Sequence, residues 1–173
     1  MLAQYRVCKN DADLAQYALY FIRHRTDFSS KFSLPDTLYH ILQSIQQSKV
    51  MLILSLEGDT IGWAHYRYLS TEYEPVREGE IAFVDSVIIN DAYRSGRLFI
   101  NGFRFLANHI AAENPKVRTF EFHALASHAY LNRLYSKFAT IVGQKDGYHE
   151  LENAYSTDFN QLLHYLNQTK NDN

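Results

Sequence analysis

Apolar residues recur at helical spacing in two segments near the start of the chain. The first segment follows Asn10 or Asp11, either of which can cap a helix, and a polar break over residues 26–31 follows it. Its apolar face consists of Leu14, Tyr17, Ala18 and Phe21. The second segment begins where Ser33 and Asp36 stand at the spacing of a capping box. Its apolar face consists of Leu38, Ile41, Leu42 and Ile45. The pattern predicts two amphipathic helices.

Strand patterns account for most of the remaining first half. The predicted strands are 5–8, 50–56, 61–69 and 81–89. Residues 57–60 form a turn that contains Gly58, so the two strands around it are predicted to pair as an antiparallel hairpin. Residues 81–89 are apolar on both alternating faces, which is typical of a buried central strand. Residues 70–79 form the longest irregular stretch and are a candidate substrate-side loop.

A helix and a strand open the second half of the chain. The helix is predicted to begin near Gly96 and to end at Asn114-Pro115, because a residue before proline disfavours helical backbone. Its apolar face consists of Phe99, Phe103, Leu106 and Ile110. Residues 117–124 then alternate as a strand. A strand, a helix and a strand in close succession imply a right-handed parallel crossover.

Three more elements are predicted towards the C-terminus. Ser127 can cap a helix whose buried face consists of Leu131, Leu134, Tyr135 and Phe138. A strand from Thr140 precedes a turn at Gly147. Apolar residues at helical spacing predict a last helix at Phe159, Leu162, Leu163 and Leu166. Residues 157–173 are therefore read as a C-terminal helix with a polar tail.

The composition fits one globular domain spanning residues 1–173. The chain is 46% hydrophobic and 21% charged, with a net charge of only -2, so no strong positive field favours nucleic acid or an anionic membrane. Small-molecule or protein substrates fit better. The single cysteine, Cys8, excludes an intramolecular disulfide and a paired-cysteine metal site. No apolar run approaches membrane-spanning length, and we expect a cytoplasmic protein with no nucleic-acid or membrane partner.

The most informative stretch is 84–99, where an apolar strand runs into a short polar turn and then into the helix near Gly96. The first turn of a helix offers unpaired N–H groups and the positive end of its dipole. Arg94 and Arg97 add cationic donors beside them. The stretch is a candidate cofactor-phosphate site, although solvated arginines at a helix start would look the same.

The order of these elements resembles the GNAT superfamily of acyl-CoA-dependent N-acyltransferases over residues 3–155. Residues 87–94 resemble the family's strand that ends in a Tyr-Arg pair ahead of the pyrophosphate loop. Residues 128–135 resemble its second motif, which ends in a Leu-Tyr pair. Both motifs depart from the family pattern. Gly96 comes one residue early, so that Arg97 and Phe99 fall where the loop glycines are expected. In the second motif His128 stands where asparagine is usual, Leu131 where a small residue is usual, and residues 139–140 where Gly-Phe usually closes the motif.

The resemblance implies an α/β fold of mixed α+β character. We expect a central mixed, mostly antiparallel sheet with one parallel βαβ crossover, flanked by helices. The resemblance also implies acetyl-CoA or another acyl-CoA as cosubstrate, and an amine-bearing acceptor that is either a small molecule or a protein. A homodimer is left open. We expect no metal site, because His123 and His128 do not form a compact metal motif.

The resemblance also implies roles for individual residues in binding the cosubstrate. Backbone amides of one strand would polarise the thioester oxygen, namely those of Val87, Ile88 and Ile89. The loop and the second motif would bind the rest of the cosubstrate through Arg94, Ser95, Gly96, Arg97, Leu98, Phe99, His128 and Asn132.

Three side chains are candidates for proton transfer. Tyr135 is the implied general acid, because its phenol could protonate the departing thiolate. Its alternative role is that of a core tyrosine at helical spacing. Asp85 and Glu121 are candidate bases for the amine, and either could instead be an ordinary strand-end carboxylate. The sequence thus predicts an N-acyltransferase that works by direct attack of a primary amine on the acyl group.

Two other functions stay open. The departures in both motifs suggest a catalytically silent GNAT-fold protein with a binding or regulatory role. A transferase that takes its acyl group from an acyl-carrier protein is the third hypothesis.

Overall fold

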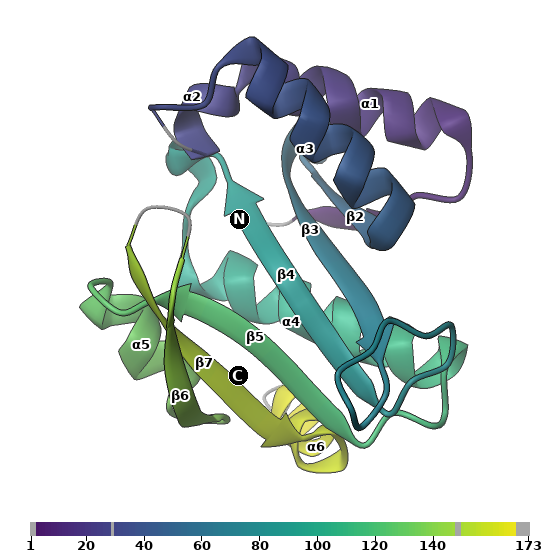
Figure 1. The fold of residues 1–173 in the computed structure, drawn as a ribbon, viewed down its shortest axis with the longest axis vertical. Coiled ribbons are helices and arrows are strands. Elements are labelled where there is room, and N and C mark those ends of the chain that lie inside the picture. The colour runs from purple at the N-terminus through teal and green to yellow at the C-terminus, as the bar shows by residue number, and fades with distance from the viewer. Residues whose placement is uncertain (1–2, 29, 148–149, 169–173) are drawn as a thin grey trace. The chain divides into compact units, whose positions relative to one another are not determined.

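The computed structural model describes residues 3–28, 30–147 and 150–168 (Figure 1). Its elements in chain order are β1 (Gln4–Val7), α1 (Asp11–Arg23), α2 (Arg25–Phe28), α3 (Leu34–Gln47), β2 (Lys49–Leu54), β3 (Thr60–Leu69), β4 (Ile81–Ile89), the 3-10 helix η1 (Asp91–Tyr93), α4 (Gly96–Glu113), β5 (Thr119–Leu125), α5 (Ala129–Tyr135), β6 (Thr140–Asp146), β7 (Leu151–Asp158) and α6 (Phe159–Gln168). The last part of the predicted polar tail, residues 169–173, lies outside the described residues.

The strands are hydrogen-bonded in the order β1-β2-β3-β4-β5-β7-β6. β4 and β5 run parallel, with Ile81–Val84 paired to Thr119–Phe122, and α4 lies between them in the chain. The pairs β1–β2, β2–β3, β5–β7 and β6–β7 are antiparallel. The predicted mixed, mostly antiparallel sheet with one parallel βαβ crossover is confirmed.

Backbone contacts divide the chain into two compact units. The first unit contains the residues up to Arg67 together with Ser86–Gly102, and the second contains Tyr68–Asp85 together with the residues from Phe103 onward. The chain passes between the units within β3, within β4 and within α4. The prediction of a single domain stays a prediction.

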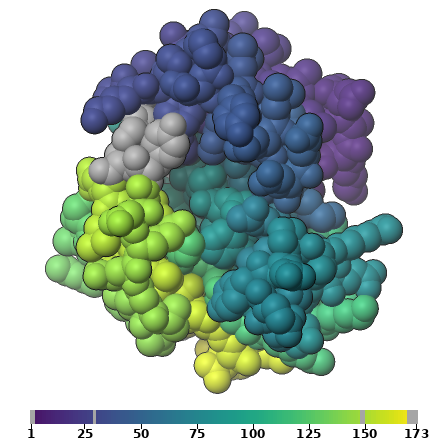
Figure 2. All heavy atoms as spheres, viewed as in Figure 1, coloured from purple at the N-terminus to yellow at the C-terminus, as the bar shows by residue number. Residues whose placement is uncertain are grey.

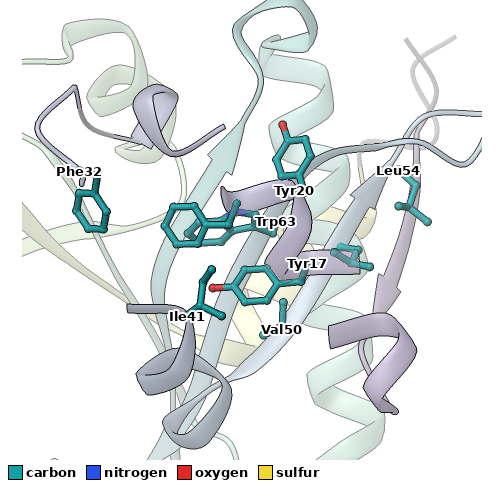
Figure 3. Close-up of a cluster of buried hydrophobic side chains, with 9 residues drawn as sticks. Tyr17, Tyr20, Phe32, Ile41, Val50, Leu54 and Trp63 are labelled. Carbon is teal, nitrogen blue, oxygen red and sulfur yellow. The ribbon is translucent and has the colours of Figure 1, made fainter. Parts of the chain in front are cut away.

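In the first unit, α1 and α3 pack on β2 and β3 around an aromatic core (Figure 3). Its buried members are Tyr17, Tyr20, Phe21, Phe32, Ile41, Val50, Leu52, Leu54 and Trp63. Both predicted helix starts are confirmed: Asn10 accepts the N–H of Asp13, and Ser33 with Asp36 forms a complete capping box. These caps supply acceptors for amides that the helices cannot satisfy internally.

Two predictions for this unit were wrong. The polar break contains the short helix α2, so residues 25–28 are not irregular. Of the predicted apolar face of α3, Ile41 and Ile45 do lie at the core, but Leu38 is 44% and Leu42 61% exposed. Thr37 is buried beside Ile41, and it can be buried because its hydroxyl donates to the Ser33 carbonyl at 2.8 Å.

In the second unit, α4 and α6 pack on β5 through aromatic and aliphatic side chains. Phe103 of α4 contacts Phe120 and Phe122, with ring centroids 5.8 and 5.4 Å apart, and Phe159 of α6 stacks on Phe120. The predicted last helix is therefore confirmed as α6. No helix among the described residues has the length and apolar character needed to cross a membrane.

The strand β7 is absent from the sequence prediction, which ended the sheet at the strand from Thr140. β7 lies between β5 and β6 and pairs with both along most of its length. Its inward residues include Tyr155, which stacks on Phe122 with ring centroids 5.0 Å apart. The remaining positions of β7 are mostly polar, so the apolar alternation that announces a strand is weak.

Candidate functional site

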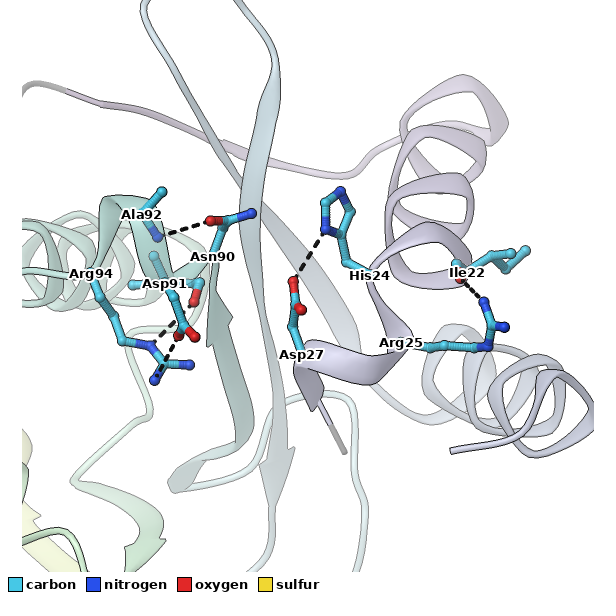
Figure 4. A network of polar contacts seen from close by, with 9 residues as sticks. Ile22, His24, Arg25, Asp27, Asn90, Asp91, Ala92 and Arg94 are labelled. Atoms are coloured by element: carbon cyan, nitrogen blue, oxygen red, sulfur yellow. Dashed lines mark hydrogen bonds and ion pairs between the residues drawn. The ribbon is translucent and has the colours of Figure 1, made fainter. Parts of the chain in front are cut away.

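The turn after β4 is built by its own hydrogen bonds (Figure 4). The Asn90 N–H donates to the Ile61 carbonyl at 2.9 Å, which fixes the end of β4 against β3. The Asn90 side chain accepts from the Ala92 N–H at 3.0 Å and caps η1. The chain therefore enters α4 through a structured turn.

Arg94 is engaged within this turn. Its Nε donates to the Ile89 carbonyl at 3.3 Å, and its guanidinium lies 3.0 Å from the Asp91 carboxylate (Figure 4). Both contacts connect the turn to the strand before it. Arg94 thus holds the turn in shape, with part of its exposed guanidinium already occupied.

Ser95 caps the first turn of α4. Its hydroxyl accepts from the Leu98 N–H at 3.2 Å, and its carbonyl accepts from the Phe99 N–H at 3.1 Å. Leu98 is only 1% exposed and belongs to the core. The amides of Leu98 and Phe99 are therefore used, whereas the amides of Ser95, Gly96 and Arg97 meet no acceptor in the part of the chain that the structure describes.

Arg97 differs from Arg94. Its side chain is exposed, and no carboxylate among residues 3–28, 30–147 and 150–168 forms an ion pair with it. Three available amides and one uncommitted guanidinium at the positive end of an 18-residue helix make a suitable position for a phosphate group.

The strand Val87–Ile89 lies in the same unit as this turn and is held from one side by β3. Gly62 passes so close to Ile88 that a Cβ on Gly62 would lie 2.3 Å from the Ile88 carbonyl oxygen. Ile88 packs against the core beneath α1 and α3, and Ser86 shares a hydrogen bond of 3.3 Å with Nδ1 of His65. Burial lowers the pKa of His65 to about 3, so its ring is neutral at physiological pH.

The second predicted motif lies in the other unit, and His128 begins its helix. Nδ1 of His128 accepts from the Leu131 N–H at 3.4 Å, so histidine performs the capping that an asparagine could perform. The prediction that Ser127 caps α5 was wrong. The Ser127 hydroxyl donates instead to the Glu150 carboxylate at 2.8 Å.

Asn132 is fully engaged inside the protein. Its amide nitrogen donates to the carbonyls of Leu125, Ala126 and His128. Its amide oxygen accepts from Asn153 at 3.0 Å and from the Tyr155 hydroxyl at 2.5 Å. Asn132 thus fixes the turn between β5 and α5 against β7.

Tyr135 lies in an aromatic cluster and is 4% exposed. Its ring contacts Phe103, Phe122, Phe138 and Tyr155. Burial, and to a smaller degree the neighbouring Tyr155, raises the pKa of the Tyr135 phenol above its usual range. The phenol is therefore protonated at physiological pH.

Of the two candidate bases, Glu121 accepts hydrogen bonds from two side-chain hydroxyl groups. Its Oε1 accepts from the Tyr73 hydroxyl at 3.1 Å and from the Ser156 hydroxyl at 3.4 Å. Asp85 is partly buried on β4 in the same unit. Sequence reasoning missed Tyr73 because no local pattern indicates which side chain a loop residue reaches. It missed Ser156 because the strand β7, which carries Ser156, was not predicted.

The predicted site residues thus fall into two sets. The first unit brings together Val87, Ile88, Ile89, Arg94, Ser95, Gly96, Arg97, Leu98 and Phe99. The second unit contains Asp85, Glu121, His128, Asn132 and Tyr135. No group of three histidine, cysteine, aspartate or glutamate side chains among the described residues is arranged to hold a metal ion.

Comparison with known proteins gives a clear result for structure and none for sequence. No protein-family sequence profile matches the chain, and no curated protein matches it by sequence. A ribosomal-protein-S5-alanine acetyltransferase from Vibrio fischeri matches with a TM-score of 0.65 at 12% identity, over 90% of this chain and 92% of that one.

Two further solved structures match to a similar degree. An acetyltransferase of the GNAT family from Streptococcus pneumoniae has a TM-score of 0.63 at 12% identity, over 91% of this chain and 99% of its own. A ribosomal L7/L12 α-N-protein acetyltransferase in complex with coenzyme A has a TM-score of 0.65 at 11% identity, over 90% and 93%. The strand order, the parallel crossover and these matches show that the chain has the GNAT fold.

Proposed function

We propose that this chain is an N-acyltransferase that moves an acetyl or other acyl group from acyl-CoA to a primary amine. The first turn of α4 is the observation that carries the proposal. The amides of Ser95, Gly96 and Arg97 and the guanidinium of Arg97 are available there for the pyrophosphate. The CoA complex of a protein with the same fold supports this choice of ligand.

The chemistry needs three contributions from the protein. Backbone amides of Val87–Ile89 polarise the thioester oxygen. A carboxylate, Glu121 or Asp85, takes a proton from the ammonium form of the amine. The neutral nitrogen then attacks the acyl carbon directly, so that a C–N bond forms and the C–S bond breaks. Tyr135 protonates the departing thiolate, and its phenolate recovers a proton from the nitrogen of the new amide.

The neighbours with the same fold suggest which acceptors to test first. Two of them are named as acetyltransferases of ribosomal proteins, one acting on S5-alanine and one on the α-amine of L7/L12. A peptide with a free N-terminal alanine is therefore a reasonable first acceptor. Small primary amines form the second group.

Addition of acetyl-CoA is expected to raise the melting temperature. A ligand present at 100 times its dissociation constant stabilises the folded state by about 2.7 kcal/mol. Thermal unfolding with acetyl-CoA, longer acyl-CoAs and CoA itself measures this effect. If none of them shifts the transition, both CoA binding and the transferase proposal are wrong.

Arg97→Ala is expected to weaken binding of acetyl-CoA about tenfold, because a charge-assisted hydrogen bond to phosphate contributes roughly 1.5 kcal/mol. Arg23→Ala is the matched control, since Arg23 is an exposed arginine of the same unit near the end of α1. Titration calorimetry gives both affinities. Equal weakening in the two variants would indicate a general charge effect and contradict the assigned site.

A silent GNAT-fold binding protein is the second candidate. It is favoured by the internal engagement of Arg94 and Asn132, which leaves fewer groups for a cosubstrate. The two candidates differ in turnover. Release of free CoA that requires an amine supports the transferase, whereas tight binding of acetyl-CoA without release across the acceptor panel supports the silent protein.

A further inference from the structure

The irregular segment between β3 and β4, residues 70–79, is tightly folded. The Ser70 N–H donates to the Glu74 carbonyl at 2.8 Å, and the Tyr73 N–H donates to the Ser70 carbonyl at 3.0 Å. The Ser70 hydroxyl also accepts from the amides of Glu72 and Glu74. At lower right, Figure 2 shows this segment standing out on the visible face. The segment can therefore hold a side chain in a fixed direction.

Tyr73 has an unusual backbone conformation within this segment. Its φ of 64° is the only positive value found for a non-glycine residue in the described chain. Such a conformation costs on the order of 1 kcal/mol for a residue with a Cβ. The Tyr73 side chain is 59% exposed, so burial of its ring offsets little of this cost. The hydroxyl, however, reaches the Glu121 carboxylate.

Glu121 receives two hydroxyl groups on one oxygen. Tyr73 donates to Oε1 from the loop, and Ser156 donates to the same atom from β7, where it is the direct partner of Glu121 in the strand ladder. No donor contacts Oε2 in the portion of the chain that the structure describes. Two donors on one oxygen fix the plane of the carboxylate and leave the other oxygen available.

We propose that Tyr73 and Ser156 position Glu121 so that its second oxygen binds the ammonium group of the acceptor. The inference rests on the proposed function, and it assigns the acceptor site to a carboxylate, a phenol and a hydroxyl that come from three separate elements. A primary ammonium has three N–H donors and a positive charge, which complement an ionised carboxylate. The exposed ring of Tyr73 also offers a face for a cation–π contact.

The ionisation of Tyr73 agrees with this arrangement. Its hydrogen bond to Glu121, together with the negative charge of that carboxylate, raises the pKa of the Tyr73 phenol. The phenol therefore stays protonated and keeps donating to Glu121 at physiological pH. Tyr73 acts through Glu121 and is a positioning residue.

Steady-state kinetics of the full chain tests the proposal, with acetyl-CoA and a peptide that begins with a free alanine. Tyr73→Phe keeps the ring and removes only the hydroxyl, and we expect about a tenfold rise in KM for the peptide with an unchanged KM for acetyl-CoA. Ser156→Ala is expected to have a smaller effect in the same direction, because its hydrogen bond is longer. Tyr39→Phe is the control. Tyr39 is an exposed tyrosine on α3, and its hydroxyl accepts a hydrogen bond from Gln43 that the substitution likewise removes.

A double-mutant cycle separates positioning from a general structural effect. In the Glu121→Gln background, Tyr73→Phe is expected to add no further change, because the two residues act as one unit. Independent, additive effects would overturn the proposal, as would a peptide KM for Tyr73→Phe equal to that of the wild type.

The activity of the wild-type chain distinguishes an error in the proposed function from an error in the positioning role of Tyr73. If the wild-type chain binds no acyl-CoA and transfers no acyl group to the peptide or to small amines, both proposals fall. If the wild type is active and Tyr73→Phe behaves like Tyr39→Phe, only the positioning role is overturned.

Discussion

Gly62→Ala is expected to destabilise the folded protein by about 3 kcal/mol, at the upper end of the usual cost of overpacking. The new Cβ would lie 2.3 Å from the Ile88 carbonyl oxygen and 3.0 Å from the Ile89 Cα. Both atoms belong to backbone, which cannot move aside as the end of a flexible side chain can. β3 and β4 would have to separate where the proposed thioester-binding amides lie. Chemical denaturation measures the loss, and affinity for acetyl-CoA should fall with it.

Gly143→Ala provides the matched control for Gly62→Ala. Gly143 lies on the exposed strand β6, and no atom lies within 4 Å of a Cβ built there. Its replacement should change the free energy of unfolding by less than about 0.5 kcal/mol, as is usual for surface sites. A similar loss in both variants would mean that the close approach of β3 to β4 does not restrict residue 62.

Tyr135→Phe is expected to lower kcat about a hundredfold while leaving affinity for acetyl-CoA nearly unchanged. General acid catalysis by a positioned side chain contributes at least about that factor, and phenylalanine preserves the ring contacts with Phe122 and Tyr155. Stopped-flow or steady-state release of the CoA thiol measures the rate, and calorimetry measures the affinity.

Tyr165→Phe serves as the control for this second substitution. Tyr165 is a partly buried tyrosine on α6 whose ring contacts Phe138, a neighbour that it shares with Tyr135. Its hydroxyl has no assigned role, so its removal should leave kcat within about twofold of wild type, as for other substitutions away from a functional group. An unchanged rate in Tyr135→Phe would remove Tyr135 from proton transfer and leave it a core tyrosine.

Much of the fold could be predicted because local signals agreed with tertiary packing. The caps at Asn10 and Ser33, the hairpin around Gly58 and the boundaries of β4 all follow from short-range chemistry. The turn before α4 was also located correctly, since a strand, a polar turn and a helix in succession leave few alternatives. Local sequence sufficed wherever the interaction that fixes an element lies within that element or its immediate neighbour.

The prediction failed where distant residues decide the outcome. Leu38 and Leu42 have the right spacing for a core face, but the packing of α3 leaves both exposed and turns Thr37 inward beside Ile41. β7 carries a weak apolar pattern and owes its place to pairing with strands on both sides.

Within the candidate site, the sequence could indicate residue types but not their partners. Binding of the cosubstrate by Arg94 and Asn132 stays a prediction, and the sequence did not indicate the contacts that both side chains make within the protein. The contact of Tyr73 with Glu121 joins residues 48 positions apart, which periodicity cannot detect. Such contacts depend on the positions of side-chain atoms in the folded protein.

The passage of the chain between the two units within β3, β4 and α4 limits how the protein can be dissected. A gene fragment that stops after Arg67 would encode α1 and α3 without Ser86 and Ile88, which contact His65 and the core. Neither unit can therefore be expressed as one uninterrupted stretch of the natural sequence. Recombination that exchanges the first and second halves with those of another protein would divide both cores.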